Sequence, residues 1–332
     1  MDSFTTRTRK AVGSLLAQGF FAGASRIGRM HPRAAPARHG VRVIKDQRYH
    51  EGRRKEHLLD VYLPAAATSD PLPIVFYVHG GGFRILSKDT HWIMGLAFAR
   101  RGYAVFNVEY RLAPAERYPA AIADVCHAYT WVIEHAARFG ADPSRVVLAG
   151  ESAGANLVTS LAAALAYERP EPWARAAYGT NAVPRAVVPA CGLFQVSDSA
   201  RFARRKPSMS SFVAERLEEI EASYLGAAPH AVSLDLADPL VLFERGEAPS
   251  RPLPPFFLPV GTKDPLLDDT RRLARALTRL GAVAEDAYYP GEVHAFHAFV
   301  MRSAARACWA DTFAFLERQG IGPRMSPGLA NG

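Results

Sequence analysis

A serine flanked by two glycines points most directly to chemistry in this chain. The stretch Gly150-Glu151-Ser152-Ala153-Gly154 follows the apolar run Arg145–Ala149 and precedes the helix-forming run Asn156–Leu165. A sharp turn from a strand into a helix strains the backbone of its serine, and small residues two places before and after it let the chain close. The pattern therefore predicts Ser152 as a nucleophile held above the edge of a sheet.

A general base and an orienting acid must accompany the serine, because its hydroxyl is a weak nucleophile at neutral pH. Asp264 follows the strand-like run Phe256–Gly261, and His294 follows the next such run, Glu285–Tyr289. Nucleophile, acid and base occur in this chain order where a strand-to-helix turn carries the serine. We predict a catalytic triad of Ser152, Asp264 and His294.

Each partner of the serine has a rival nearby in the sequence. Asp268 lies at the expected start of the next helix, where it could favour the helix dipole instead, and His297 lies one helical turn after His294. Loops at strand ends present side chains better than helix interiors do. We therefore favour Asp264 over Asp268 and His294 over His297.

A glycine run supplies candidate donors for negative charge. The sequence His79-Gly80-Gly81-Gly82-Phe83 follows the apolar run Ile74–Val78, and residues without side chains let backbone N–H groups point inward. We predict an oxyanion hole of Gly81, Gly82 and Ala153. A phosphate-binding turn is the alternative, but no Walker lysine or G-x-G-x-x-G helix follows.

Strand-like and helix-like runs alternate from residue 41 onward, which indicates a mostly parallel sheet wrapped by helices. Ligands of such sheets bind beyond the carboxyl ends of the strands. The strands are expected at Val41–Arg48, His57–Leu63, Leu72–Val78, Tyr103–Glu109, Val146–Ala149, Ala186–Ala190, Phe256–Gly261 and Glu285–Tyr289, and the helices at Trp92–Arg101, Ala120–Phe139, Asn156–Ala166, Thr270–Leu280 and Ser303–Gln319.

Residues 193–243 break this alternation. They hold the basic stretch Arg201–Lys206 and a helix-like run over Val213–Leu225, without a strand of their own. An insertion after a sheet strand would lie over the carboxyl edge, so we expect a lid; a purely structural excursion is the alternative.

The N-terminal segment permits two interpretations. Three basic residues, Arg7, Arg9 and Lys10, precede the apolar stretch Ala11–Ala24, which resembles an export signal. Helical spacing of its apolar residues favours an amphipathic helix instead, followed by a linker over His31–Gly40. We expect a cytoplasmic protein, with export as the alternative if residues 1–24 act as a signal. No apolar run is long enough for stable membrane insertion.

Composition narrows the class of protein. The 332 residues are 49% hydrophobic and 22% charged, as in ordinary globular proteins. The net charge is +8, but the basic residues are scattered and no nucleic-acid-reading motif is present, so we expect no nucleic-acid partner. Cys126, Cys191 and Cys308 lie in apolar surroundings without C-x-x-C spacing, which predicts buried reduced thiols.

Five motifs in order give the chain a family resemblance. They are His79-Gly-Gly-Gly82, Glu109-Tyr-Arg-Leu-Ala-Pro114, Gly150-Glu-Ser-Ala-Gly154, Gly261-Thr-Lys-Asp-Pro-Leu266 and His294-Ala-Phe296. Together they resemble the hormone-sensitive-lipase family of esterases, also called bacterial family IV. The resemblance implies an α/β-hydrolase with a mostly parallel eight-stranded sheet flanked by helices and a helical cap. It also implies hydrolysis of short- to medium-chain acyl esters without a cofactor.

The family's organisation gives expected domain boundaries. Residues 1–40 would form the N-terminal cap segment, 41–192 the first part of the catalytic domain, 193–243 the cap insertion and 244–332 the second part. The chain departs from the family at Glu151, where Asp is usual, at Ala155, where Gly is frequent, and at Ala115, which stands before Glu116. For Tyr110, Arg111 and Asp124 we expect structural hydrogen bonding rather than catalysis.

The sequence also contains candidate residues for a substrate pocket and for a metal site. Aromatic residues that could line an apolar pocket, or pack in the lid or core, are Phe83, Trp92, Phe194, Phe202 and Phe212. His294, His297 and Glu292 suggest zinc ligands, but no second cluster accompanies them, so we expect neither metal nor cofactor.

Two other functions remain open at this stage. We expect a small-molecule ester as the substrate, but the same triad would also serve an amidase or peptidase. A receptor without turnover is the other alternative, because plant gibberellin receptors resemble this family but lack the catalytic histidine; the presence of His294 favours an enzyme. The chain also leaves a homodimer open.

Overall fold

The computed structural model describes residues 23, 31, 34–66, 70–226 and 233–322. The predicted amphipathic helix or export signal, and most of the N-terminal cap segment, lie outside these residues. Within the expected linker, Pro36–His39 form a short 3-10 helix, η2, that leads into the first strand.

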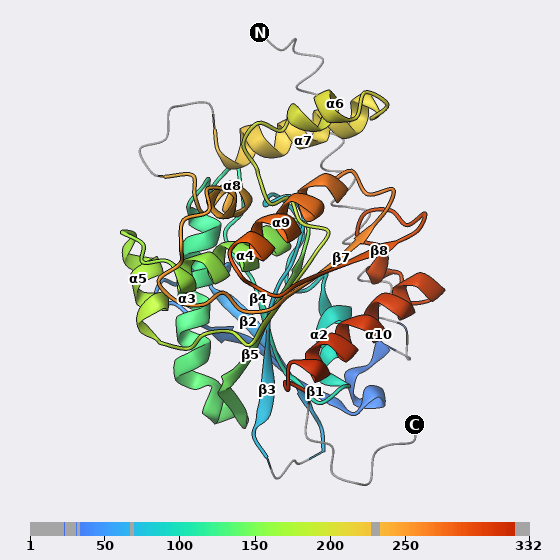
Figure 1. The fold of residues 1–332 in the computed structure, drawn as a ribbon. Coiled ribbons are helices and arrows are strands. Elements are labelled where there is room, and N and C mark those ends of the chain that lie inside the picture. Colours follow the sequence, from blue (N-terminus) through green and yellow to red (C-terminus); the bar gives the residue numbers. More distant parts are fainter. Residues whose placement is uncertain (1–22, 24–30, 32–33, 67–69, 227–232, 323–332) are drawn as a thin grey trace.

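Eight strands form one sheet in the order β1-β2-β4-β3-β5-β6-β7-β8 (Figure 1). Strand β2 runs antiparallel to both of its neighbours, and every pair from β4 to β8 is parallel. The predicted mostly parallel eight-stranded sheet is confirmed. The strands are β1 Val41–Arg48, β2 Leu58–Pro64, β3 Leu72–Val78, β4 Ala104–Val108, β5 Ala141–Glu151, β6 Ala186–Ala190, β7 Phe256–Gly261 and β8 Ala284–Tyr289.

Helices cover both faces of the sheet (Figure 1). Helices α3, α4, α5, α8 and α9 pack on one face, and α2 and α10 on the other. The helices are α2 Trp92–Ala99, α3 Ala120–His135, α4 Ala153–Ala166, α5 Pro172–Gly179, α6 Arg201–Arg205, α7 Ser211–Tyr224, α8 Pro239–Glu244, α9 Leu267–Arg279 and α10 Ser303–Arg318, with 3-10 helices η3 Ala136–Phe139 and η4 Phe296–Ala298.

The central strands are apolar because both of their faces are covered. Every residue of β3, β4, β6 and β7 is buried. Helix α4 begins at Ala153, earlier than predicted, because the turn at Ser152 leads directly into it. The short α5 escaped prediction; it begins at Pro172, whose missing N–H suits a first helical turn.

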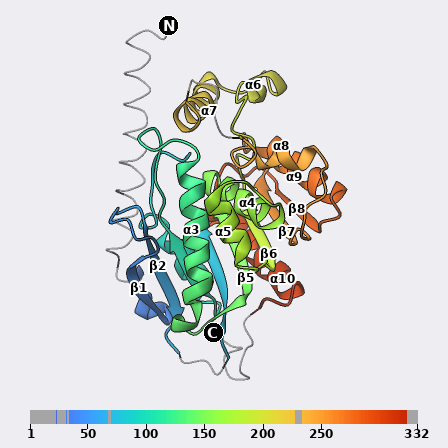
Figure 2. The ribbon, with the colours of Figure 1, turned by 90° about the vertical axis from the view of Figure 1, so that its left-hand side faces the viewer.

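Helices α6 and α7 of the insertion lie beyond one end of the sheet, outside both helix layers (Figure 2). Helix α7 rests on the loop that follows β3: the rings of Phe83 and Tyr224 stack with centroids 3.9 Å apart, and Arg84 pairs with Glu219 at 2.8 Å. The described part of residues 193–243 contains no strand, as predicted. Helix α8, by contrast, belongs to the main core, because Leu240 and Phe243 are buried there.

Three carboxylates fix the start of the insertion, residues 194–199, which we call the stem. Each carboxylate accepts two consecutive backbone amides at 2.6–3.2 Å: Asp269 those of Phe194 and Gln195, Asp238 those of Val196 and Ser197, and Glu221 those of Asp198 and Ser199. Buried Arg201 balances Asp269 with hydrogen bonds of 2.6 and 2.9 Å. Ionised acceptors make strong hydrogen bonds, so the stem is held firmly to α7, to the start of α8 and to α9.

A close approach of two backbones sets the position of α4. A Cβ atom added at Gly154 would lie 2.1 Å from the carbonyl oxygen of Val78 and 2.7 Å from that of His79. Backbone at the end of a central strand cannot give way as a flexible side chain can. Only glycine at position 154 therefore lets the first turn of α4 meet the end of β3.

We predict that Gly154→Ala lowers the free energy of unfolding by about 3 kcal/mol, the upper end of ordinary overpacking costs. Gly179→Ala is the matched control, because a Cβ atom there meets nothing within 4 Å and alanine favours the helix. Urea unfolding of both variants measures the difference. Equal midpoints for the two variants would contradict the close-approach argument.

Candidate active site

Ser152 stands at the turn between β5 and α4. Its φ of 55° and ψ of −117° are strained for a residue with a side chain, a conformation that costs on the order of 1–3 kcal/mol. The Ser152 amide donates to the carbonyl oxygen of Ala190 at the end of β6, at 3.0 Å. The fold thus holds the serine at the carboxyl edge of the sheet.

His294 and Asp264 complete a continuous line of hydrogen bonds with the serine. His294 Nε2 lies 3.0 Å from Ser152 Oγ, and His294 Nδ1 lies 2.9 Å from Asp264 Oδ2. The other oxygen of Asp264 accepts the amide of Leu266 at 2.8 Å. The aspartate is buried, whereas 35% of the His294 side chain is exposed. The arrangement is that of a nucleophile, a base and an acid that orients the base.

The surroundings of His294 favour its protonated form. Burial lowers the pKa of the ring, but the Asp264 carboxylate, together with Cys191, raises it by more, and the pKa stands well above its ordinary value. An imidazole of this kind binds the proton of an attacking hydroxyl strongly.

The two alternative residues, Asp268 and His297, are not part of this line of hydrogen bonds. Asp268 is exposed on α9 and pairs with Arg205. His297 is buried in η4, where burial lowers its pKa to about 4. In the part of the chain that the structure describes, neither rival is hydrogen-bonded to Ser152 or His294.

Backbone amides beside the serine are arranged for an anion. Gly81 and Gly82 have φ of 118° and 59°, and a Cβ atom at Gly81 would lie 2.1 Å from the Ile85 carbonyl oxygen. Ala153 is the first residue of α4, so its amide has no partner within the helix. Among the described residues, the amides of Gly81, Gly82 and Ala153 donate to no other protein group. Three such donors can stabilise negative charge that develops beside Ser152.

Comparison with known proteins places this geometry in a family. Residues 75–298 match the model of a family described as having the alpha/beta hydrolase fold. The chain belongs to this family. It is 33% identical over 253 residues to carboxylesterase NlhH of Mycobacterium tuberculosis, with 74% of each chain covered, and 32% identical over 248 residues to an ethyl acetate hydrolase of Pseudomonas putida, with 73% of each covered.

A solved relative supports the same assignment over more of the chain. The esterase LipW from Mycobacterium marinum superposes with a TM-score of 0.72 at 25% identity, covering 93% of this chain and 91% of that one. The predicted resemblance to the hormone-sensitive-lipase esterases within the alpha/beta hydrolases is thereby confirmed.

Glu151 stands where that family usually has aspartate. It joins the turn at Ser152, the serine turn, to Gly80, Gly81 and Gly82, which we call the glycine loop. Its carboxylate accepts the amide of Gly80 at 2.6 Å, His91 Nε2 at 2.7 Å and the hydroxyl of Tyr77. Burial alone would raise the pKa of Glu151, but the charge and hydrogen bond of His91, helped by Tyr77, lower it to about 2. Burial lowers the pKa of His91, but the Glu151 carboxylate raises it by more, so the net pKa of His91 lies above its ordinary value. The two side chains therefore form an ion pair.

Sequence reasoning missed this role because Tyr77, Gly80 and His91 are distant from Glu151 in the chain. The family departure at position 151 was the one signal, and it named no partner. The structural role expected for Tyr110, Arg111 and Asp124 matches their contacts: Tyr110 donates to the His79 carbonyl at 2.9 Å, and Arg111 binds Asp124 through bonds of 2.7 and 2.8 Å.

The fold places the aromatic candidates in different surroundings. Phe83 and Phe194 are fully buried, and Phe202 is buried beneath Arg201. Trp92 packs against the core between the sheet and helices α2 and α10, whereas Phe212 is 62% exposed on α7. Their surroundings therefore differ, and a pocket that they line together stays a prediction.

Three smaller expectations can be compared with the fold. Cys126, Cys191 and Cys308 are free and buried, as predicted. The suggested zinc set is not assembled, because Glu292 pairs with Arg302 at 3.0 Å and His297 lies in η4. Among the described helices, none has the length and apolarity that crossing a membrane requires.

The position of Glu151 gives a prediction for catalysis. Glu151→Gln removes the charge that holds His91 and the Gly80 amide, so we expect kcat for ester hydrolysis to fall about tenfold, less than the loss of a direct oxyanion donor. KM should change little, because the loop acts on the transition state. Steady-state kinetics measure the split, and Glu151→Asp, which keeps the charge, should retain more activity. An unchanged kcat in Glu151→Gln would exclude a positioning role.

Proposed function

We propose that this protein is a serine carboxylesterase that hydrolyses short- to medium-chain acyl esters through Ser152, His294 and Asp264. By homology to its carboxylesterase and ethyl acetate hydrolase relatives, the chain is a carboxylic ester hydrolase. The observation that carries the proposal is the unbroken line of hydrogen bonds from Ser152 Oγ through the His294 ring to Asp264.

Acylation begins with attack of Ser152 Oγ on the ester carbonyl carbon. His294 Nε2 accepts the hydroxyl proton as the bond forms, while Asp264 keeps the Nδ1–H proton in place and stabilises the imidazolium. The carbonyl oxygen becomes an oxyanion, which the amides of Gly81, Gly82 and Ala153 bind. Because these amides are fixed by backbone geometry, they need little reorganisation when the charge forms.

Collapse of the tetrahedral intermediate releases the alcohol. His294 gives its proton from Nε2 to the leaving oxygen, and the acyl group remains on Ser152. A water molecule then loses a proton to Nε2, attacks the acyl-enzyme and regenerates the serine through a second oxyanion. The same histidine therefore serves as base and acid in each half of the cycle.

Helix α7 supports a preference for small acyl groups. A Cβ atom added at Gly82 would lie 3.0 Å from Cγ1 and from Cδ1 of Ile220 on α7. The Ile220 side chain therefore limits the space beside the glycine loop. We take α6 and α7 as the cap over the site. The similarity to an ethyl acetate hydrolase of Pseudomonas putida and to acetyl esterases of Salmonella agrees with short acyl chains.

We predict that Ser152→Ala lowers kcat on p-nitrophenyl acetate by about 10⁴- to 10⁶-fold, as in other serine hydrolases that lose the nucleophile. Ser144→Ala, at an exposed serine, should keep wild-type activity. A fluorophosphonate probe should label the wild type at Ser152. Near wild-type hydrolysis by Ser152→Ala would overturn the proposal, and an unlabelled wild type would favour a receptor. The same assay over longer acyl chains and on matched anilides separates ester from amide preference.

The pH dependence of kcat/KM follows from His294. The protonated ring cannot accept the Ser152 proton, so activity falls as pH drops through the pKa of His294. Because Asp264 raises that pKa, we expect the acid limb above about 6.5, the ordinary value for histidine. Asp264→Asn removes the raising charge and should move the limb to lower pH while reducing kcat. A profile that stays flat from about pH 5 to 8 would rule out His294 as the base.

A further inference from the structure

Cys191 is a buried thiol beside the triad that the proposed reaction does not use. It follows β6 directly and is 1% exposed. Its φ of 43° is unusual for a residue with a side chain, and its amide donates to the carbonyl oxygen of Pro259 at 3.0 Å. The backbone between β6 and β7 therefore holds this side chain in place.

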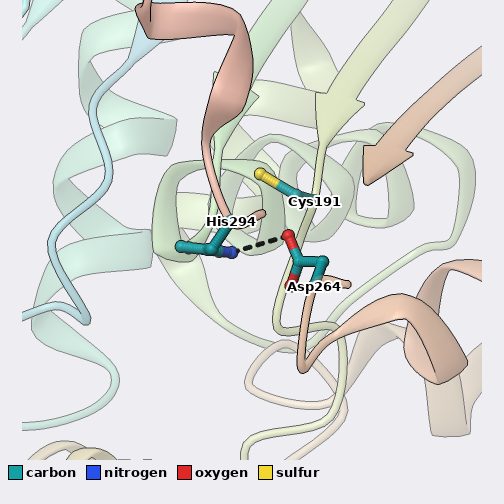
Figure 3. A group of neighbouring side chains, drawn as sticks. All are labelled: Cys191, Asp264 and His294. Carbon is teal, nitrogen blue, oxygen red and sulfur yellow. Dashed lines mark hydrogen bonds and ion pairs between the residues drawn. The ribbon is translucent and has the colours of Figure 1, made fainter. Parts of the chain in front are cut away.

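The thiol, the His294 ring and the Asp264 carboxylate converge (Figure 3). One ligand atom from each residue lies within 4.8 Å of the other two. The nitrogen of His294 that faces Asp264 is Nδ1, at 2.9 Å. In the ranges that the structure covers, no other three residues among histidine, cysteine, aspartate and glutamate come this close.

The chemistry of these donors selects a class of cation. Sulfur, nitrogen and oxygen at about 2.0–2.3 Å from the metal are the ligands of zinc, and three protein ligands with one open position are usual in accessible zinc sites. Mg²⁺ and Ca²⁺ bind sets of oxygen atoms instead, and thiolate favours softer ions. Donors of a tetrahedral site at those bond lengths are about 3.3–3.8 Å apart, so a small closure of the three side chains would suffice.

We propose that Cys191, Asp264 and His294 form an inhibitory site for a thiophilic divalent cation, Zn²⁺ or Cd²⁺. Binding replaces the thiol proton, which leaves to solvent, and uses the lone pair of His294 Nδ1. The single proton of the neutral ring must then move from Nδ1 to Nε2. A ring that carries its proton on Nε2 cannot accept the proton of Ser152. The inhibition, though not the binding, rests on the proposed function.

Inhibition of ester hydrolysis tests the consequence of binding. Each protein is assayed with increasing Zn²⁺ and compared with its own metal-free rate, with Mg²⁺ as the control ion. We expect the Zn²⁺ concentration for half-inhibition to rise at least tenfold in Cys191→Ala. Cys126→Ala, which removes a buried thiol on α3, should keep the wild-type sensitivity. Equal sensitivity of the wild type and Cys191→Ala would overturn the proposal.

Binding itself is measured without activity. Cd²⁺ added to the wild type and to Cys126→Ala should produce the ultraviolet charge-transfer absorption of a cadmium thiolate, and Cys191→Ala should lack it. Cys191→Ser, close in size, serves if the alanine variant does not fold, since a hydroxyl gives no such band. Absence of the band in the wild type, or its persistence without Cys191, would refute the site. A wild type that shows the band but hydrolyses no ester would refute the proposed function alone.

Discussion

Contact between the first turn of α4 and the end of β3 brings the two halves of the site together. Gly154 lies against the carbonyl oxygens of Val78 and His79, so the serine turn and the glycine loop share one edge of the sheet. Glu151 then links them by accepting the Gly80 amide, and His91 neutralises its charge. A nucleophile and its oxyanion donors stay aligned only if their backbones move together. Here Glu151, the residue before Ser152, makes that connection. Its carboxylate is buried and ionised, so the hydrogen bonds that it accepts are strong.

Parallel pairing brings the residues of the proposed triad together, as the contact at Gly154 brings the glycine loop to Ser152. Strands β5, β6, β7 and β8 are neighbours and parallel, so their carboxyl ends meet at one edge. Ser152 follows β5, Asp264 follows β7 and His294 follows β8, which separates them widely in sequence but not in space. The end of β6 lies between them and contributes the Ala190 carbonyl that anchors the serine. The same geometry places Cys191, the residue after β6, beside Asp264 and His294.

What the sequence could predict depended on local signals. The sheet, Ser152, Asp264 and His294 were marked by apolar runs and by residues at strand ends, where position in the chain determines position in space. Phe83 and Phe212 were not predictable in the same way. Phe83 is buried with Tyr224 stacked on its ring, whereas Phe212 is exposed on α7 with the Arg216 guanidinium over its ring. The partners of Glu151 and the neighbours of Cys191 likewise come from distant segments of the chain. Burial of aromatic and charged groups is decided by tertiary packing, which no short pattern encodes.

The way in which the stem is held determines which parts of the insertion can vary among related enzymes. The six consecutive amides of the stem are held by Asp269, Asp238 and Glu221, and Asp238 immediately precedes α8, where the chain rejoins the core. Asp269 lies on α9, the helix that follows Asp264, so the stem and the proposed triad depend on the same segment of the chain. Entry to and exit from the insertion are thus tied to each other and to the catalytic scaffold. Between them, Glu221 holds the stem, and Glu219 and Tyr224 contact the loop after β3. The other residues of the insertion can change in sequence or length as an exchangeable segment, and variation in substrate range can accumulate there without disturbing these contacts.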